Sequence, residues 1–90
     1  MKLQIQNKSL KINEIKNLVE NGAITEANIH GDGIGLGYLI FFETPVSHIF
    51  PQTQRGKHKS YKTLEAAMNE VKRLGLDGFH FSFGYEDHDD

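Results

Sequence analysis

Residues 55–85 read RGKHKSYKTLEAAMNEVKRLGLDGFHFSFGY, and they shape the expected fold more than any other segment. Apolar side chains recur at helical spacing over Leu64–Leu74, with Thr63 before them as an N-cap and Gly75 after them as a stop signal. Phenylalanine then alternates with polar residues, which predicts a strand over Gly78–Tyr85. Because almost no linker separates these pieces, we expect one compact unit.

The first half of the chain predicts one helix and two strands. Ile12–Glu20 spaces its apolar residues three and four apart, and Asn21-Gly22 ends this helix. Ala23–His30 alternates in polarity, whereas Gly37–Phe42 is apolar on both faces and is therefore expected at the centre of the sheet. The glycine-rich residues 31–35 are expected to join the two strands as a hairpin.

A third strand is expected to be irregular. Pro51 lacks an N–H donor and must lie at an edge or a bulge, and the later half of the strand is placed at about Gln54–Tyr61. The element order is then α-β-β-β-α-β, with a short strand over Leu3–Gln6 left open. We expect an α+β fold in which a small antiparallel sheet packs against two helices. Residues 1–90 make a single domain, with residues 86–90 as a disordered acidic tail.

Size and composition favour a binding protein. Ninety residues with 38% hydrophobic side chains supply one core and leave little room for an enclosed active site. The absence of cysteine excludes disulfides and thiolate metal sites and fits a reducing compartment. Met1–Gln6 is too polar for a signal peptide, and no window is apolar over the length of a bilayer, so we expect a cytoplasmic protein.

No motif indicates catalysis, a cofactor or a metal. Gly33–Gly37 has the composition of a phosphate-binding loop, but it leads into a strand where such loops lead into a helix. The histidines do not form the helical i, i+4 pair of zinc enzymes, and His80 is expected to be a hydrogen-bonded ring opposite the phenylalanines. We therefore expect no enzyme activity, no catalytic residues, no cofactor and no metal site. The five histidines are His30, His48, His58, His80 and His88.

Charge is segregated along the chain although the net charge is only -2. Residues 23–54 contain no Lys or Arg, and residues 77–90 hold five acids and no Lys or Arg. Residues 55–62 hold four Lys and Arg residues and no acid. Such segregation influences the choice of partner more than the near-neutral total does.

The basic segment is the candidate partner-binding site. On a strand, Arg55, Lys57 and Lys59 share one face at intervals of about 7 Å, Tyr61 lies on the same face, and Lys62 follows beside the helix. Such a row could bind a negatively charged protein surface or follow a phosphate backbone. It could also serve only to protect an edge strand from self-pairing.

Several segments resemble one protein family. Leu18–Ala27, Gln54–Lys57, Tyr61–Ala67 and Leu74–Phe81 are similar to small partition-associated (ParC-type) proteins of plasmids and integrated mobile elements, which are unrelated to the topoisomerase subunit of similar name. The resemblance extends over Ile12–Phe83. It implies a small non-enzymatic accessory of mobile DNA that needs no cofactor.

Three functions follow as hypotheses. The first is a plasmid or mobile-element maintenance accessory that binds a macromolecule, most readily a protein, through the basic edge strand. The second is an inhibitor of a host defence nuclease (anti-CRISPR-type) that uses the acids of residues 86–90. The third is direct DNA binding. No membrane partner is expected, and homodimerisation through the third strand or the phenylalanine-rich strand is left open.

Overall fold

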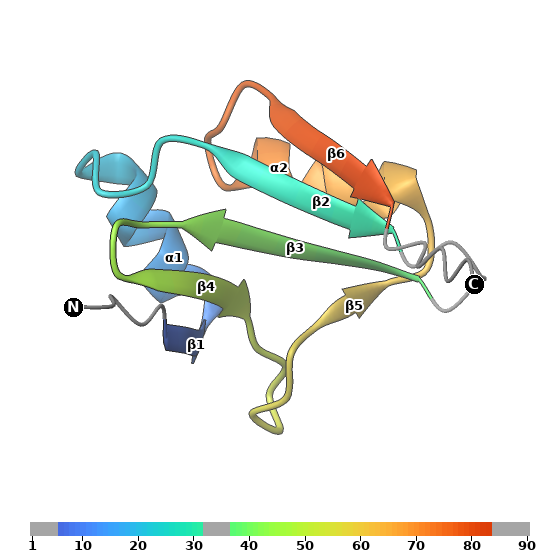
Figure 1. The fold of residues 1–90 in the computed structure, drawn as a ribbon, viewed down its shortest axis with the longest axis horizontal. Helices are drawn as coiled ribbons and strands as arrows, with labels where there is room; N and C mark the ends of the chain where they lie inside the picture. The colour runs from blue at the N-terminus through green and yellow to red at the C-terminus, as the bar shows by residue number, and fades with distance from the viewer. Residues whose placement is uncertain (1–5, 32–36, 84–90) are drawn as a thin grey trace, which may run out of the picture.

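The computed structural model describes residues 6–31 and 37–83, which form two helices packed on one mixed sheet (Figure 1). Along the path β1-β4-β3-β2-β6 neighbouring strands are hydrogen-bonded, and β5 pairs with the beginning of β3. The elements are β1 (Gln6–Leu10), α1 (Ile12–Glu20), β2 (Ala27–Gly31), β3 (Tyr38–Glu43), β4 (Ser47–Pro51), β5 (Ser60–Tyr61), α2 (Leu64–Arg73) and β6 (Phe79–Phe83).

The expected α+β class with two helices is confirmed, but the expectation of a wholly antiparallel sheet is wrong. β1 pairs parallel with β4 and β2 pairs parallel with β6, so among the described strands β3 alone runs against the others. The reason is that α1 follows β1 and α2 precedes β6, and a helical crossover returns the chain in the same direction. The short first strand lies at Gln6–Leu10, whereas most of the expected Leu3–Gln6 falls outside the described residues.

Both helices have the expected boundaries to within one residue. α1 spans Ile12–Glu20, and α2 begins after Thr63, whose Oγ1 accepts a hydrogen bond of 3.0 Å from the Ala66 N–H. Each helix ends at a glycine with positive φ, which is 82° at Gly22 and 101° at Gly75. In each case the N–H of the following residue bonds back five positions, from Ala23 to the Leu18 carbonyl and from Leu76 to the Val71 carbonyl, so both ends are Schellman motifs.

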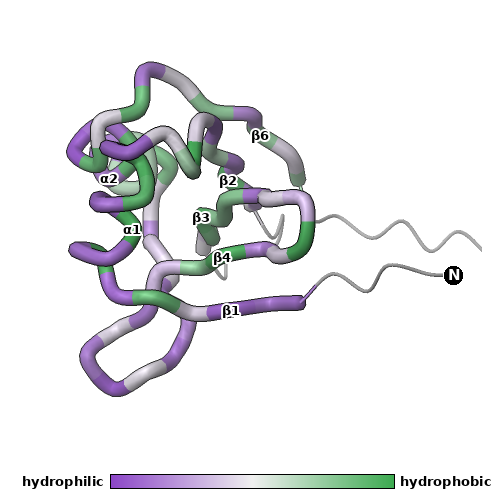
Figure 2. The backbone as a smooth tube through the Cα atoms, turned by 90° about the vertical axis from the view of Figure 1, so that its left-hand side faces the viewer, coloured by the Kyte–Doolittle hydropathy of each residue, from purple (hydrophilic) through white to green (hydrophobic). Residues whose placement is uncertain are grey.

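The hydrophobic core lies between the sheet and the two helices, which cover the same side of the sheet (Figure 2). Register places Ile29 opposite Ile40 and Phe42 opposite Ile49, and all four side chains are buried. Full burial of one such side chain contributes about 1.5–3 kcal/mol. β3 lies at the centre of the strand path, as its apolar sequence predicted.

The opposite side of the sheet, here called the open face, carries the alternate residues of the same strands. Phe41, His48 and Phe50 lie on it and are half-buried, next to Asn28 and His30 of β2. Neither described helix covers this side (Figure 2). The open face is therefore a surface that the fold leaves free of helices.

The expected strand over Gln54–Tyr61 is wrong for most of its length. β4 ends at Pro51, and the chain leaves the sheet as a loop over residues 52–59, here called the basic loop, before it returns as the two-residue β5. Gly56, at φ 85°, allows a tight turn that the alternating polar sequence did not reveal. Figure 1 shows this loop projecting from the body of the molecule between β4 and β5.

Two sequence predictions fall partly or wholly outside the described residues. Gly31 lies opposite Tyr38, as a hairpin between β2 and β3 requires, but residues 32–36 of the connection are not described. The acidic residues 86–90 also lie outside the described part. Neither described helix combines the length and apolarity needed to cross a bilayer.

Candidate partner-binding surface

The structure divides the five predicted site residues into two groups. Arg55, Lys57 and Lys62 are exposed, whereas Lys59 is half-buried and Tyr61 is 7% exposed. The prediction that the cations and Tyr61 share one strand face is wrong, because the basic loop is a turn and only Tyr61 of that row belongs to a strand. Tyr61 therefore presents no aromatic surface to a partner.

The basic loop is held in shape by Thr53. Its Oγ1 accepts hydrogen bonds of 3.2 Å from the backbone N–H groups of both Arg55 and Lys57. The Thr53 N–H donates to the Lys57 carbonyl at 2.7 Å, and the Gly56 N–H donates to the Thr53 carbonyl at 2.9 Å. The backbone polar groups of the turn are thus used internally, while the Arg55 and Lys57 side chains point to solvent.

The second group surrounds a buried acid on α2. Glu70 is 4% exposed, and its Oε1 lies 3.4 Å from both Lys59 Nζ and the Tyr61 hydroxyl, which donates to it. Arg73 Nη1 lies 3.7 Å from Glu70 Oε2. Lys59 Nζ also lies 5.2 Å from the centroid of the Tyr61 ring, within cation–π range. This Glu70 cluster joins the end of the basic loop to α2.

The environment of Tyr61 is unfavourable to the phenolate. Burial, and then the negative charge of Glu70 with its hydrogen bond, raises the pKa of Tyr61 well above its usual value. The phenol therefore stays protonated and continues to donate to Glu70 throughout the neutral range. Its role here is structural.

Aromatic rings on the open face lie next to the basic loop. His58 of the loop stacks on Phe50 with ring centroids 4.4 Å apart and an interplanar angle of 5°. Phe41 lies 5.6 Å from Phe50 and 5.5 Å from His48, again between centroids. These four residues, here called the aromatic strip, extend from the loop across β4 to β3.

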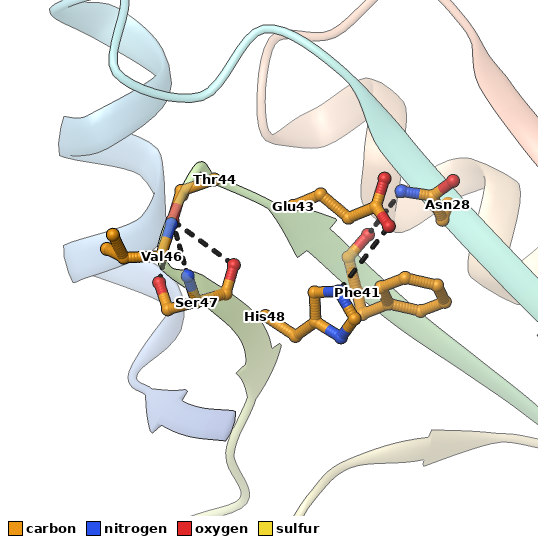
Figure 3. Close-up of polar contacts among 7 residues, drawn as sticks. All are labelled: Asn28, Phe41, Glu43, Thr44, Val46, Ser47 and His48. Carbon is orange, nitrogen blue, oxygen red and sulfur yellow. Dashed lines mark hydrogen bonds and ion pairs between the residues drawn. The ribbon is translucent and has the colours of Figure 1, made fainter. Parts of the chain in front are cut away.

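The β3–β4 turn fixes one end of the aromatic strip (Figure 3). Thr44 Oγ1 accepts a hydrogen bond of 2.9 Å from the Ser47 N–H and lies 2.8 Å from Ser47 Oγ. This tight turn places Glu43 opposite His48, and their side chains pair at 3.4 Å beside the Phe41 ring (Figure 3). The one carboxylate of β3 is thus directed to a histidine of the same face.

The other end of the open face is polar. His80 Nε2 lies 3.2 Å from Glu26 Oε1, so the expected hydrogen bond of His80 is confirmed. His30 Nδ1 and Ser82 Oγ share a hydrogen bond of 3.0 Å. Within residues 6–31 and 37–83, no three His, Asp or Glu side chains gather in a way that could hold a metal ion. The grooves found on the described surface are open.

Sequence reasoning missed both the Glu70 cluster and the aromatic strip. Glu70 follows Ala67 by three positions and precedes Leu74 by four, so the helical spacing already placed it on the apolar side of α2. The strip gave a weaker signal. Phe41 and Phe50 alternate with buried residues, but the stacking of His58 on Phe50 depends on the path of the basic loop.

In comparisons with known proteins, no family model, no curated protein and no solved structure matches this chain.

Proposed function

We propose that this chain is a non-enzymatic interaction protein that binds an acidic macromolecular partner, a protein in the first instance, through the basic loop. The observation that carries the proposal is the position of Arg55 and Lys57, exposed on a projecting turn beside the aromatic strip. Lys62 is exposed near the start of α2 and extends the positive surface. Lys59 and Tyr61 act indirectly, by anchoring the loop.

Preorganisation of the loop supports this function. The turn is fixed by Thr53 and the return of the chain is fixed by the Glu70 cluster, so binding orders little additional backbone. An arginine can form two parallel hydrogen bonds with one carboxylate or phosphate. Aromatic side chains beside such a cation are frequent energetic centres of interfaces, and Phe50 and His58 are in that position.

A maintenance role in a plasmid or mobile element is supported by the sequence resemblance alone, whereas a cytoplasmic location is supported by the absence of cysteine, which fits a reducing compartment. The nuclease-inhibitor alternative depends on acids outside the described residues and remains a separate hypothesis.

Single-stranded nucleic acid is the second candidate partner. Bases stack on aromatic rings in many open sheets, and each stacked base contributes about 1–3 kcal/mol. The aromatic strip next to two exposed cations offers both stacking surfaces and phosphate contacts. Against this candidate, the chain has a net charge of -2, and Glu43 lies on the same face.

Capture from host lysate with the wild-type chain and an Arg55→Glu/Lys57→Glu variant tests the proposal. The variant should lose the partner, whereas Lys8→Glu/Lys16→Glu, which makes the same charge change at two exposed sites elsewhere, should retain it. Equal capture by both double variants would contradict the proposal.

Nuclease treatment of a parallel lysate separates the two candidate partners. A protein partner should survive the treatment. Direct titration of a single-stranded oligonucleotide at two salt concentrations completes the test, since phosphate contacts require affinity that falls with salt. Salt-dependent oligonucleotide binding that Phe50→Ala weakens would favour the second candidate.

A further inference from the structure

The edge strand β6 lacks the features that usually prevent strands from pairing with other chains. Its sequence, Phe-His-Phe-Ser-Phe, contains no Lys, Arg, Asp, Glu or Pro. Phe81 is 40% exposed and Phe83 is 62% exposed. Among the described strands β6 pairs only with β2, so its outer backbone groups have no strand partner there. The opposite edge, β1, carries Lys8 and mostly exposed polar residues.

A groove runs beside the start of the same strand. It has a volume of about 340 Å³ and lies between α2 and β6, with Met68, Leu76 and Phe79 among its lining residues. Met68 is 40% exposed there. The phenylalanines of β6 share the helix-covered side of the sheet with Ile29, but α2 packs over β2 and β3. The side of β6 that faces the helix layer is therefore only partly covered.

We propose that two copies of this chain associate through β6, paired antiparallel and centred on Phe81. In this register Phe83 of one copy lies opposite Phe79 of the other and enters the groove beside it. Phe83 and the groove beside Phe79 lie four residues apart on one strand. In the antiparallel arrangement the Phe83 ring of each copy therefore fills the groove of the other copy, and the contact is made twice. This self-complementarity favours a second copy over a different protein.

Symmetry supports a closed dimer. Antiparallel pairing of identical strands obeys a two-fold axis, and each β6 has one free edge, so the association ends at two chains. The axis is perpendicular to the sheet and keeps both helix layers on one side. The basic loops lie away from the β6 edge (Figure 1), so this inference is independent of the proposed function.

Sedimentation velocity over a concentration series tests the dimer. Phe83→Lys should weaken self-association at least tenfold, because it removes an aromatic contact from each half of the two-fold interface. Val46→Lys is the matched control, because Val46 is also an exposed apolar residue, at 59%, and lies in the β3–β4 turn. It should associate like the wild type. A wild-type chain that stays monomeric at every concentration would overturn the inference, as would unchanged dimerisation of Phe83→Lys.

Disulfide trapping tests the register without removing a phenylalanine, and the absence of native cysteine makes it unambiguous. His80 of one copy faces Ser82 of the other, at a Cα separation of about 4.5–5.5 Å, within the range for a disulfide. A mixture of His80→Cys and Ser82→Cys proteins should cross-link under mild oxidation, and either protein alone should not. Efficient cross-linking of Ser82→Cys with itself would instead indicate parallel pairing and overturn the proposed arrangement.

Discussion

The tip of the basic loop and its base differ in what their charges do, although both belong to one short basic segment. At the tip, Arg55 and Lys57 are exposed on a turn whose backbone is already satisfied. At the base, Lys59 and Tyr61 are held by a buried carboxylate on α2. A row of like charges in a sequence can therefore contain both a recognition element and its anchor. The assignment depends on what the rest of the fold places beside each side chain.

The largest expected effect is at the base. Tyr61→Ala removes a buried ring and should lower the free energy of unfolding by about 3–5 kcal/mol, the usual cost of deleting a large core side chain. Urea denaturation measures this loss. Val46→Ala, at an exposed site, should stay within about 0.5 kcal/mol of the wild type. If the two variants were equally stable, the base would not be an anchor.

Removal of the acid should have a smaller effect. Glu70→Ala leaves the buried Tyr61 hydroxyl without its acceptor and should cost about 1–3 kcal/mol. Glu65→Ala, an exposed acid in the first turn of the same helix, should change stability by less than about 1 kcal/mol. Equal losses of unfolding free energy at the two positions would contradict the role of Glu70 as the buried hydrogen-bond acceptor of Tyr61.

Alkaline pH acts on the same cluster. The folded state raises the pKa of Tyr61 above the unfolded value of about 10, so the folded state holds the proton more tightly. The stability linked to Tyr61 is complete below pH 10 and is lost as the pH rises above it. Thermal unfolding should show a steeper alkaline decline for the wild type than for Tyr61→Phe, and Tyr38→Phe should decline like the wild type. Identical declines in all three proteins would contradict this account.

The smallest change in stability is expected at Lys57 and Lys59, which should differ in whether they affect stability or partner binding. Lys59→Ala should cost about 1 kcal/mol or less, because Arg73 remains near Glu70, and should change partner affinity little. Lys57→Ala should leave stability unchanged and weaken partner binding. Denaturation and binding measured on both variants should therefore separate the two roles: Lys59 affects stability, and Lys57 affects partner binding. The comparison fails if the effects are reversed.

Local sequence patterns predicted the parts of the fold that local chemistry determines. The helix ends followed from apolar spacing, from Thr63 and from Gly22 and Gly75, and the central position of β3 followed from its apolar sequence. The two parallel pairs were missed because each joins strands that are distant in the sequence, and no short window shows which strands lie side by side.

The candidate site was predictable only in part. Residues 54–59 alternate like a strand, but the positive φ of Gly56 and the hydrogen bonds of Thr53 form a turn instead. The cations Arg55 and Lys57 at the tip are exposed, as predicted. Tyr61 was predicted to lie on the binding face but is buried. The aromatic strip needs β3, β4 and the loop to be assembled, which no short window of sequence contains.

The pairing of β3 has a consequence for how this protein can vary. β4 and β5 cover the two ends of β3 along the same edge, and residues 52–59 are an excursion between them. The length and composition of the excursion can change at a small entropic cost without altering either strand pair. Insertions and exchanged sequences should therefore be tolerated there, so the same scaffold can acquire new recognition specificities at one point of its chain.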